Sequence, residues 1–270
     1  MIVAVDTGGT KTLITLFSNK GVAGEMIRFP TPPKKEDYIK LLKDTLVSNY
    51  GGQKIDAIVI AMPGIIEDGI AVWCNRLKWE NFDVEKALRG VLGDAPIFVE
   101  NDANLAGLGE TRPRSPMPKS SLYVTVSTGI GTGIITNGHI DPGVHMSEGG
   151  RMELEYNGKT QEWENFASGR AIYETYGQFA KDIHDPKTWD EVADKISRGF
   201  LVAIPLLQPE VIIIGGSIGT YFSKYSKQLK SLLVKNLPDH IPCPPILQAK
   251  NPEEAVIYGC YYHAVDSLND

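Results

Sequence analysis

The chain has 270 residues, 42% of them hydrophobic and 22% charged, with a formal net charge of −6 at pH 7. This length allows one large domain or two smaller ones, and the acidic balance argues against a nucleic-acid partner, because phosphate backbones attract cations. The sequence shows no span apolar enough for a membrane, no basic start of a signal peptide and only three scattered cysteines, so we expect a cytoplasmic protein without a disulfide framework.

A hairpin is predicted at the N-terminus. Ile2–Val5 are apolar, Asp6–Lys11 read DTGGTK, and Leu13–Phe17 are apolar again. Two such runs around a short glycine turn are typical of paired strands. A helix is expected next at Glu36–Asn49, where apolar residues recur at helical spacing.

Two buried strands and a second helix are expected further on. Ile55–Met62 is rich in isoleucine and valine and ends at Pro63-Gly64. Pro96–Val99 is a shorter strand that Glu100-Asn101-Asp102 would stop. Ala103–Glu110 has good helix formers, and the Asn-Asp pair before it is placed as an N-cap.

A proline-rich segment separates the two halves of the chain. Thr111–Ser121 contains three prolines and three cations, which disfavour both a helix and a central strand, so it is the best linker candidate. The pattern then restarts with a strand at Leu122–Val126, a loop at Ser127–Gly133 and a strand opening at Ile134. Asn137-Gly138 predicts a hairpin turn.

The two halves resemble each other in outline. Late elements are a strand at Val211–Ile214, closed by Gly215-Gly216, and a helix at Glu253–Leu268. Since each half begins with a strand, a glycine turn and a second strand, we expect a duplicated α/β architecture of two lobes with a cleft between them. The predicted lobes are residues 1–112 with 256–270, and residues 113–255.

Both glycine turns could bind phosphate. Glycine permits a tight turn and close approach to backbone N–H groups. The hydroxyls of Thr10 and Thr128 and the ammonium of Lys11 could add donors, and Asp6 could hold a magnesium ion through water. Neither turn has the spacing of a P-loop or a dinucleotide fingerprint, and a plain hairpin turn is the alternative for each.

The carboxylates at Glu100-Asn101-Asp102 lie where a predicted strand ends. Ligands of α/β sheets bind at such strand ends. A carboxylate there could take a proton from a substrate hydroxyl during phosphoryl transfer. Capping of the following helix is the alternative role, and the two roles are compatible.

Together these segments resemble the ROK family (repressors, open reading frames and sugar kinases) over nearly the whole chain. Five motifs occur in the family's order: Asp6–Lys11, Ala61–Gly64 followed by Asn75, Glu100–Asn104, Ser127–Gly133 and Ile213–Ser217. The resemblance implies two RNase H-like lobes of the actin-like ATPase type. It also implies a homodimer and ATP-dependent phosphorylation of a hexose, by default glucose, at its 6-hydroxyl.

The resemblance also assigns residues to the expected site. Asp102 would be the general base. The sugar would contact Gly64, Asn75, Asn101, Asp102, Glu148, Arg151 and Glu164. The nucleotide would contact Asp6, Gly8, Gly9, Thr10, Lys11, Thr128, Gly129, Gly131, Gly215 and Gly216. Magnesium would be held by Asp6, through water.

One departure from the family pattern concerns zinc. Many members bind a structural zinc ion through one histidine and three cysteines, but here Arg151 stands at the histidine position and Tyr156–Glu164 has no cysteine. Arginine stays protonated and cannot ligate zinc, so we expect no zinc site. Arg151 could instead pair with Glu148 or Glu153 or reach a sugar hydroxyl, and it could also suit an anionic or modified sugar.

Two alternative functions stay open. Short zinc-free members of the family include polyphosphate-dependent glucokinases, and Arg112, Arg114 and Lys119 would offer a thin basic track for such a donor. A sugar-binding regulator that has lost turnover is the other alternative. A DNA-binding repressor is disfavoured, because the first motif begins at residue 6 and leaves no room for a winged helix-turn-helix before it.

Overall fold

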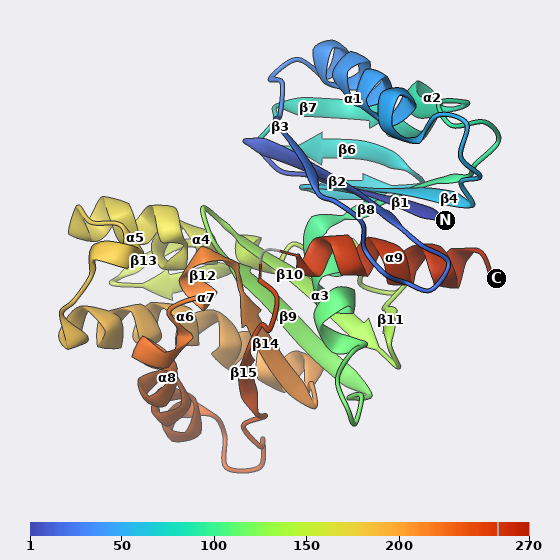
Figure 1. The fold of residues 1–270 in the computed structure, drawn as a ribbon. Helices are drawn as coiled ribbons and strands as arrows, with labels where there is room; N and C mark the ends of the chain where they lie inside the picture. The colour runs from blue at the N-terminus through green and yellow to red at the C-terminus, as the bar shows by residue number, and fades with distance from the viewer. Residues whose placement is uncertain (253, 270) are drawn as a thin grey trace. The chain divides into compact units, whose positions relative to one another are not determined.

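The computed structural model describes residues 1–252 and 254–269. The chain forms two compact units (Figure 1). Unit 1 comprises Met1–Gly109 and the segment from Glu254 on, and unit 2 comprises the residues between them. The domain boundaries predicted after residues 112 and 255 stay a prediction, since compactness alone does not show which segments fold as independent units.

Unit 1 is built on a five-stranded sheet in the order β3-β2-β1-β4-β8. Its strands are β1 (Ile2–Thr7), β2 (Lys11–Phe17), β3 (Ile27–Pro30), β4 (Ala57–Met62) and β8 (Ile97–Asn101). The first three pair antiparallel, whereas β4 lies parallel to both β1 and β8. The carboxyl ends of β1, β4 and β8 therefore meet at one edge of the sheet.

Among the described residues, a smaller antiparallel sheet and four helices complete unit 1. The sheet contains β5 (Ile65–Glu67), β6 (Ile70–Cys74) and β7 (Trp79–Asp83). The helices are α1 (Lys35–Tyr50), α2 (Val84–Leu88), α3 (Asp102–Thr111), which crosses into unit 2, and α9 (Ala255–Ser267). Helices α1 and α9 cover opposite faces of the large sheet (Figure 1), and all six residues of β4 are buried between them.

Unit 2 repeats this topology with the sheet order β11-β10-β9-β14-β15. Its strands are β9 (Ser120–Val126), β10 (Ile130–Thr136), β11 (His139–Ile140), β14 (Val211–Gly215) and β15 (Ile246–Gln248). Again three strands pair antiparallel and two are added parallel. The same strand order in both units confirms the predicted duplicated α/β architecture.

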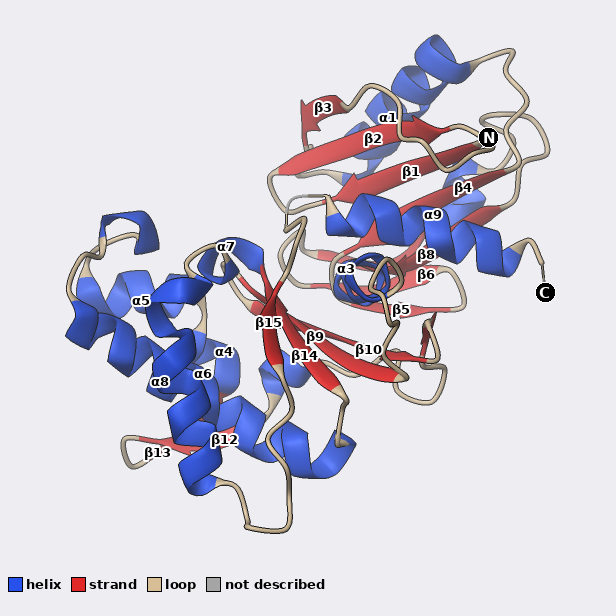
Figure 2. Cartoon of the chain, turned by 60° about the horizontal axis from the view of Figure 1, so that its bottom comes forward, coloured by secondary structure: helices blue, strands red, loops and turns tan. Residues whose placement is uncertain are grey.

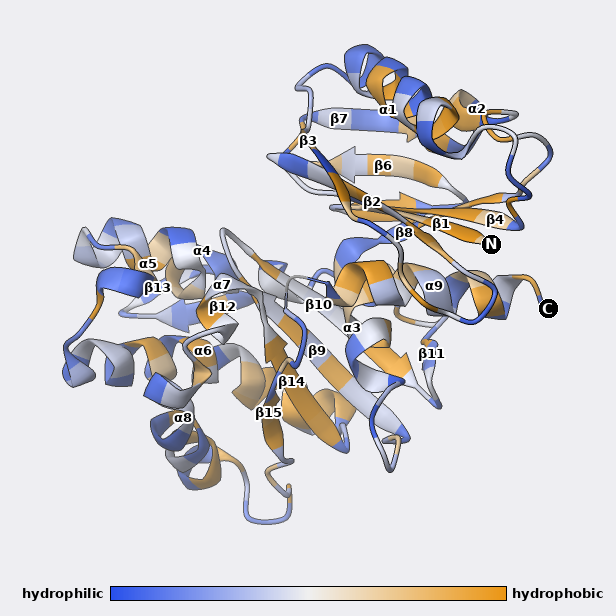
Figure 3. Ribbon diagram, viewed as in Figure 1, coloured by the Kyte–Doolittle hydropathy of each residue, from blue (hydrophilic) through white to orange (hydrophobic). Residues whose placement is uncertain are grey.

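The other elements of unit 2 are mostly helical. A hairpin is formed by β12 (Glu153–Tyr156) and β13 (Lys159–Glu162). The helices are α4 (Trp163–Ala167), α5 (Gly169–Tyr176), α6 (Pro186–Leu207), α7 (Gly216–Gly219) and α8 (Phe222–Asn236), with short 3₁₀ helices at Gly149–Arg151 and Ala180–Asp182. Helices α6 and α8 pack against each other (Figure 2), and the apolar strand β14 lies in the core beside them (Figure 3).

Three expected element boundaries differ from the structure. Strand β8 continues to Asn101, because it pairs with β4 as far as Met62. The predicted loop at Ser127–Gly133 is much shorter, since Ile130 already pairs with Val126. The predicted terminal helix begins at Ala255 in the structure, and its expected first residue, Glu253, lies outside the described residues.

Two further local predictions, one of a turn and one of a linker, have different outcomes. Asn137 and Gly138 both have left-handed backbone angles, with φ of 52° and 79°, and join β10 to β11 as predicted. The predicted linker is shorter than expected, because Thr111 ends α3 and Ser120 begins β9.

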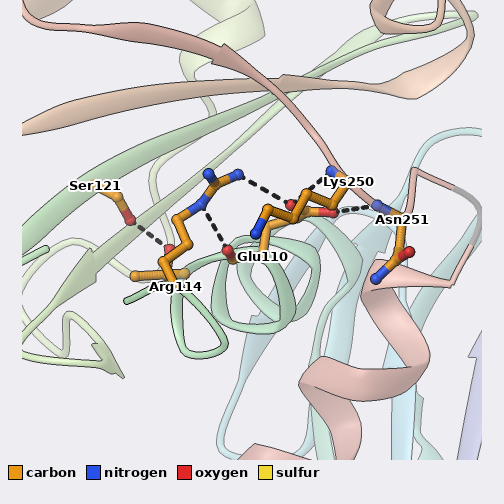
Figure 4. A network of polar contacts seen from close by, with 6 residues as sticks. Glu110, Arg114, Ser121, Lys250 and Asn251 are labelled. Atoms are coloured by element: carbon orange, nitrogen blue, oxygen red, sulfur yellow. Dashed lines mark hydrogen bonds and ion pairs between the residues drawn. The ribbon is translucent and has the colours of Figure 1, made fainter. Parts of the chain in front are cut away.

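The start of this linker is anchored by a buried carboxylate (Figure 4). Glu110 pairs with Arg114 at 3.2 Å, and its two carboxylate oxygens accept from the backbone N–H groups of Lys250 and Asn251 at 2.9 and 2.7 Å. These bonds tie the end of α3 to the segment that precedes α9.

None of the helices in the described part of the chain combines the length and the apolar character needed to cross a bilayer.

Candidate active site

The first glycine turn of unit 1 is tight and exposed. The N–H of Gly8 donates to the carbonyl of Lys11 at 2.9 Å, while Gly9, Thr10 and Lys11 are exposed. Thr31 braces the turn from outside: its N–H donates to the carbonyl of Thr10 at 3.1 Å and its hydroxyl to that of Gly8 at 2.8 Å. A phosphate could therefore reach a turn whose shape is already fixed.

Two carboxyl groups lie at the same sheet edge. Asp6 is the residue before the last of β1, and Asp102 begins α3 directly after β8. Burial and the charge of Asp102 raise the pKa of Asp6 to about 7, with Lys11 opposing. Burial also raises the pKa of Asp102 to about 6, opposed by Arg76 and by backbone N–H groups of α3.

This arrangement fits a divalent cation. Magnesium prefers oxygen ligands and keeps several of its waters. A cation held near Asp6 would offset the cost of placing two carboxylates close together in partly buried positions. Asp6 and the adjoining turn therefore have the chemistry expected for magnesium and phosphate.

Asn101 links the strand edge to the predicted sugar loop. Its amide nitrogen donates to the carbonyl of Gly64 at 2.8 Å, and its amide oxygen accepts from the N–H groups of Ala103 and Asn104 at 2.8 and 3.0 Å. Asn101, rather than Asp102, is thus the side chain that caps α3. The carboxylate of Asp102 interacts with backbone N–H groups at the start of α3, but it is not the side chain that caps the helix.

Gly64 is required at its position by geometry. Its φ is +97°, and a Cβ added there would lie 2.0 Å from the carbonyl oxygen of Trp73. The end of β6 therefore packs directly on Gly64, and Asn75 is exposed on the turn that follows. Trp79, just beyond it, is buried and donates to the carbonyl of Pro33 at 2.8 Å, so its ring belongs to the core and not to a sugar platform.

In unit 2, Arg151 is held by two acids that the sequence analysis did not consider as its partners. Its guanidinium lies 2.6 Å from a carboxylate oxygen of Glu162 and 3.3 Å from one of Glu164. The second oxygen of Glu164 accepts from the backbone N–H of Ile130 at 3.2 Å. Arg151 thus fixes the orientation of a carboxylate predicted to bind sugar.

Glu148 precedes the 3₁₀ helix that contains Arg151, and the glycines after it pack tightly on β10. A Cβ on Gly150 would lie 2.1 Å from the carbonyl of Ile130. The hydroxyl of Thr132 accepts from the N–H of Gly149 at 3.0 Å. Thus the backbone that carries Glu148 is fixed by contacts that allow no side chain at these two positions.

The second of the two glycine turns lies in unit 2, and its structure differs from that of the turn in unit 1. The chain reverses within Ser127–Gly129, where the N–H of Ser127 donates to the carbonyl of Gly129 at 2.9 Å, and Thr128 is exposed. Gly215 and Gly216 lie against the neighbouring strand β9: a Cβ on Gly216, whose φ is +77°, would lie 2.5 Å from the carbonyl of Val126. These two glycines therefore bring the start of α7 close to the turn.

A pocket of about 510 Å³ opens beside this turn. Its lining combines residues of α5, α7 and the 3₁₀ helix near Ala180, namely Thr128, Gly169, Arg170, Tyr173, Phe179, Ala180, Lys181, Ser217, Ile218 and Tyr221. Tyr173 and Phe179 stack with ring centroids 4.5 Å apart and are both exposed. Among the predicted site residues, only Thr128 lines this pocket in the described structure.

Sequence reasoning missed the aromatic part of this pocket and also missed Thr31. No sequence pattern identifies the role of Thr31, since a single threonine after a strand can serve many structural roles. The segment Ser168-Gly169-Arg170 could have pointed to the pocket, because a capping serine opens a helix there.

Among residues 1–252 and 254–269, no group of three or more His, Cys, Asp or Glu side chains is placed to hold a metal ion.

Known proteins share both the sequence pattern and the fold. The chain is 26% identical to a fructokinase from Lactococcus lactis subsp. cremoris, with 89% of this chain and 87% of the relative covered. It is 29% identical to an N-acetylmannosamine kinase from Haemophilus influenzae, with 99% and 96% covered. A ROK family glucokinase from Streptomyces griseus, solved with glucose and AMPPNP, superposes with a TM-score of 0.82 at 21% identity, covering 98% of this chain and 99% of that one.

The fold of the Streptomyces structure agrees with the predicted actin-like, two-lobed α/β class. The model of the ROK family matches residues 2–266, which is nearly the whole chain. The chain therefore belongs to the ROK family.

Proposed function

We propose that the protein transfers a phosphoryl group from a nucleoside triphosphate to a hydroxyl of a hexose, with Asp102 as the general base. One observation supports this most directly: a partly buried carboxyl lies at the same sheet edge as an exposed, preformed phosphate turn. The acceptor oxygen forms a bond to the γ-phosphorus as the bond to the leaving diphosphate breaks. The hydroxyl proton passes to Asp102, and the bonding electron pair stays on the diphosphate oxygen.

The proton affinity of Asp102 suits this role. With a pKa of about 6, it is largely ionised at pH 7 and still binds a proton more strongly than an ordinary aspartate. The adjacent Asn101 takes over the capping of α3, so Asp102 can face a substrate. Magnesium near Asp6 would neutralise charge on the phosphates when bound.

The pocket in unit 2 favours a nucleotide over polyphosphate as the donor. An exposed aromatic pair suits a nucleobase, which has a flat apolar face, whereas polyphosphate has none. Arg114, one of three cations considered for a polyphosphate track, is 11% exposed and is bound to Glu110. ATP is therefore the proposed donor.

The acceptor is proposed to be a hexose with a free primary hydroxyl at carbon 6, with glucose tested first. The relatives named above are kinases of fructose, N-acetylmannosamine and glucose, so the acceptor panel has to include all three. In unit 1 the sugar contacts proposed are Gly64, Asn75 and Asn101. Those proposed in unit 2 are Glu148, Arg151 and Glu164, of which Arg151 acts by orienting Glu164. The predicted homodimer and cytoplasmic location stay predictions.

The decisive test is an ADP-release assay with ATP and magnesium over a panel of hexoses and amino sugars, repeated with polyphosphate by following the sugar phosphate. We expect ADP release with at least one hexose, and loss of more than about 10³-fold in kcat for Asp102→Asn with sugar binding preserved. Activity retained in this variant would show that Asp102 is not the base. Sugar binding without turnover in the wild type would instead identify a regulator.

A further inference from the structure

Arg76 is a cation at the phosphate turn that neither the motifs nor the family resemblance had singled out. It follows Asn75 in the turn between β6 and β7, and it is exposed. The Cβ and Cδ of Arg76 would lie 3.5 and 3.6 Å from a Cβ added to Gly9, so its side chain runs alongside the glycine turn. Arg76 therefore lies beside the glycine backbone that is proposed to bind phosphate.

The position of this turn is well determined within unit 1. Gly64 packs on the backbone of Trp73 and Cys74, and its carbonyl accepts from Asn101, the residue before Asp102. The turn itself is closed by the N–H of Leu77 donating to the carbonyl of Cys74 at 3.1 Å. The stem of Arg76 therefore starts from rigid backbone between the phosphate turn and the candidate base.

The electrostatics agree with this position. Among the influences that lower the pKa of Asp102, the charge of Arg76 is the largest. The guanidinium therefore lies close enough to interact electrostatically with the carboxylate of Asp102. Within the described part of the chain, no hydrogen bond or ion pair engages the guanidinium. Its planar set of donors is thus available for a ligand, and such a set matches phosphate oxygens well.

We propose that Arg76 is a catalytic residue that binds the oxygens of the phosphoryl group as it moves from the nucleotide to the sugar hydroxyl. This inference rests on the proposed function. In the transition state the negative charge of the transferring group is spread over its non-bridging oxygens. A fixed cation between donor phosphate and acceptor base is worth most at that moment, so its removal lowers kcat more than it changes either KM.

The test compares Arg76→Gln and Arg76→Lys with the wild type, using the hexose that gives the highest turnover. We expect kcat to fall roughly 10- to 100-fold for Arg76→Gln, with KM for sugar and for ATP within about threefold of wild type. Arg76→Lys keeps the positive charge but loses the planar set of N–H donors, so its kcat should lie between those of wild type and Arg76→Gln. Arg89→Gln is the matched control, because it removes another exposed arginine of unit 1, one paired with Glu85.

A second readout separates catalysis from structure. Guanidinium ion added at millimolar concentration should restore part of the kcat of Arg76→Ala and should not affect Arg89→Gln. ADP with aluminium fluoride and sugar, a mimic of the transferring group, should bind wild type more tightly than Arg76→Gln, while ADP alone binds both equally.

Three outcomes would overturn the inference. The first is a kcat of Arg76→Gln within twofold of wild type. The second is a raised KM for sugar with unchanged kcat, which would make Arg76 a contact of the acceptor sugar. The third is equal binding of the aluminium fluoride complex by wild type and Arg76→Gln. Failure of the proposed function would look different, because the wild type itself would then release no ADP with any hexose.

Discussion

Replacement of Asp102 by asparagine is expected to stabilise the protein while it removes turnover. Burial raises the pKa of Asp102 from 3.8 to about 6, which means that the fold disfavours its ionised form. A difference of this size corresponds to about 3 kcal/mol at a pH where the group is fully ionised. Relaxation and partial access of water reduce the effect, so we expect a gain of about 1–2 kcal/mol in the free energy of unfolding at pH 8.

The gain should depend on pH in a defined direction. Well below pH 3.8 the carboxyl is protonated in both the folded and the unfolded chain, so the raised pKa does not affect stability there. As the pH rises, the unfolded chain releases the proton near 3.8, whereas the folded chain holds it until about 6. The stability of the wild type therefore falls relative to Asp102→Asn as the pH rises from about 4 to about 6, and the difference is largest above that range.

The assay is thermal or urea unfolding of the variants and the wild type in metal-free buffer at pH 3, 4, 6 and 8. Asp185→Asn is a control of opposite sign, because Asp185 caps α6 from the surface and its pKa is lowered by hydrogen bonds from Thr188 and Lys187. That variant should be less stable than wild type at pH 8 and close to it at pH 3. The reasoning is refuted if Asp102→Asn is no more stable than wild type at pH 8, or gains equally at pH 4.

Three other variants test the remaining parts of the site. Arg151→Met leaves the carboxylates of Glu162 and Glu164 without their shared cation, so KM for sugar should rise several-fold and the free energy of unfolding should fall by about 1 kcal/mol; an unchanged KM would exclude a role in orienting the sugar contact. Phe179→Ala removes one ring of the exposed aromatic pair, which should raise KM for ATP about 2- to 10-fold and leave KM for sugar unchanged in initial-rate kinetics. Gly64→Ala should destabilise the fold by roughly 3 kcal/mol or more in urea unfolding, because its φ of +97° and the contact with the carbonyl at residue 73 leave no room for a methyl group; near-wild-type stability would contradict that geometry.

Much of the fold could be predicted because its signals are local. The hairpin at residues 2–17 and the turn at Asn137-Gly138 follow from apolar runs around glycine and asparagine, which need no information from distant residues. Repetition of a strand, a glycine turn and a strand was enough to predict a duplicated architecture. The boundary errors at β8 and β10 have the opposite origin, since pairing with a neighbouring strand extends each beyond what its own sequence indicates.

The parts of the site that were missed depend on contacts far apart in the sequence. Thr31 braces a turn that lies 21 or more positions earlier, and nothing in its neighbours indicates this. Glu162 was not predicted as a partner of Arg151, because only the hairpin of β12 and β13, which folds back, brings it beside the guanidinium. The position of Arg76 could not be predicted for the same reason, because only the folded chain shows that its side chain runs beside Gly9.

The neighbours Asn101 and Asp102 show how the fold and the proposed chemistry share one short segment. A helix that starts at a sheet edge needs an acceptor for its first N–H groups, and Asn101 supplies it while also holding Gly64. With those demands met, the next carboxylate is not the main capping acceptor, and burial can raise its pKa even though backbone N–H groups at the start of α3 act in the opposite direction. Exchanging the two residues would keep a capping oxygen in place but move the carboxylate into the cap, where several N–H groups would lower its pKa. The order Asn-Asp, and not merely the presence of both residues, is therefore what would suit this strand end to the proposed proton transfer.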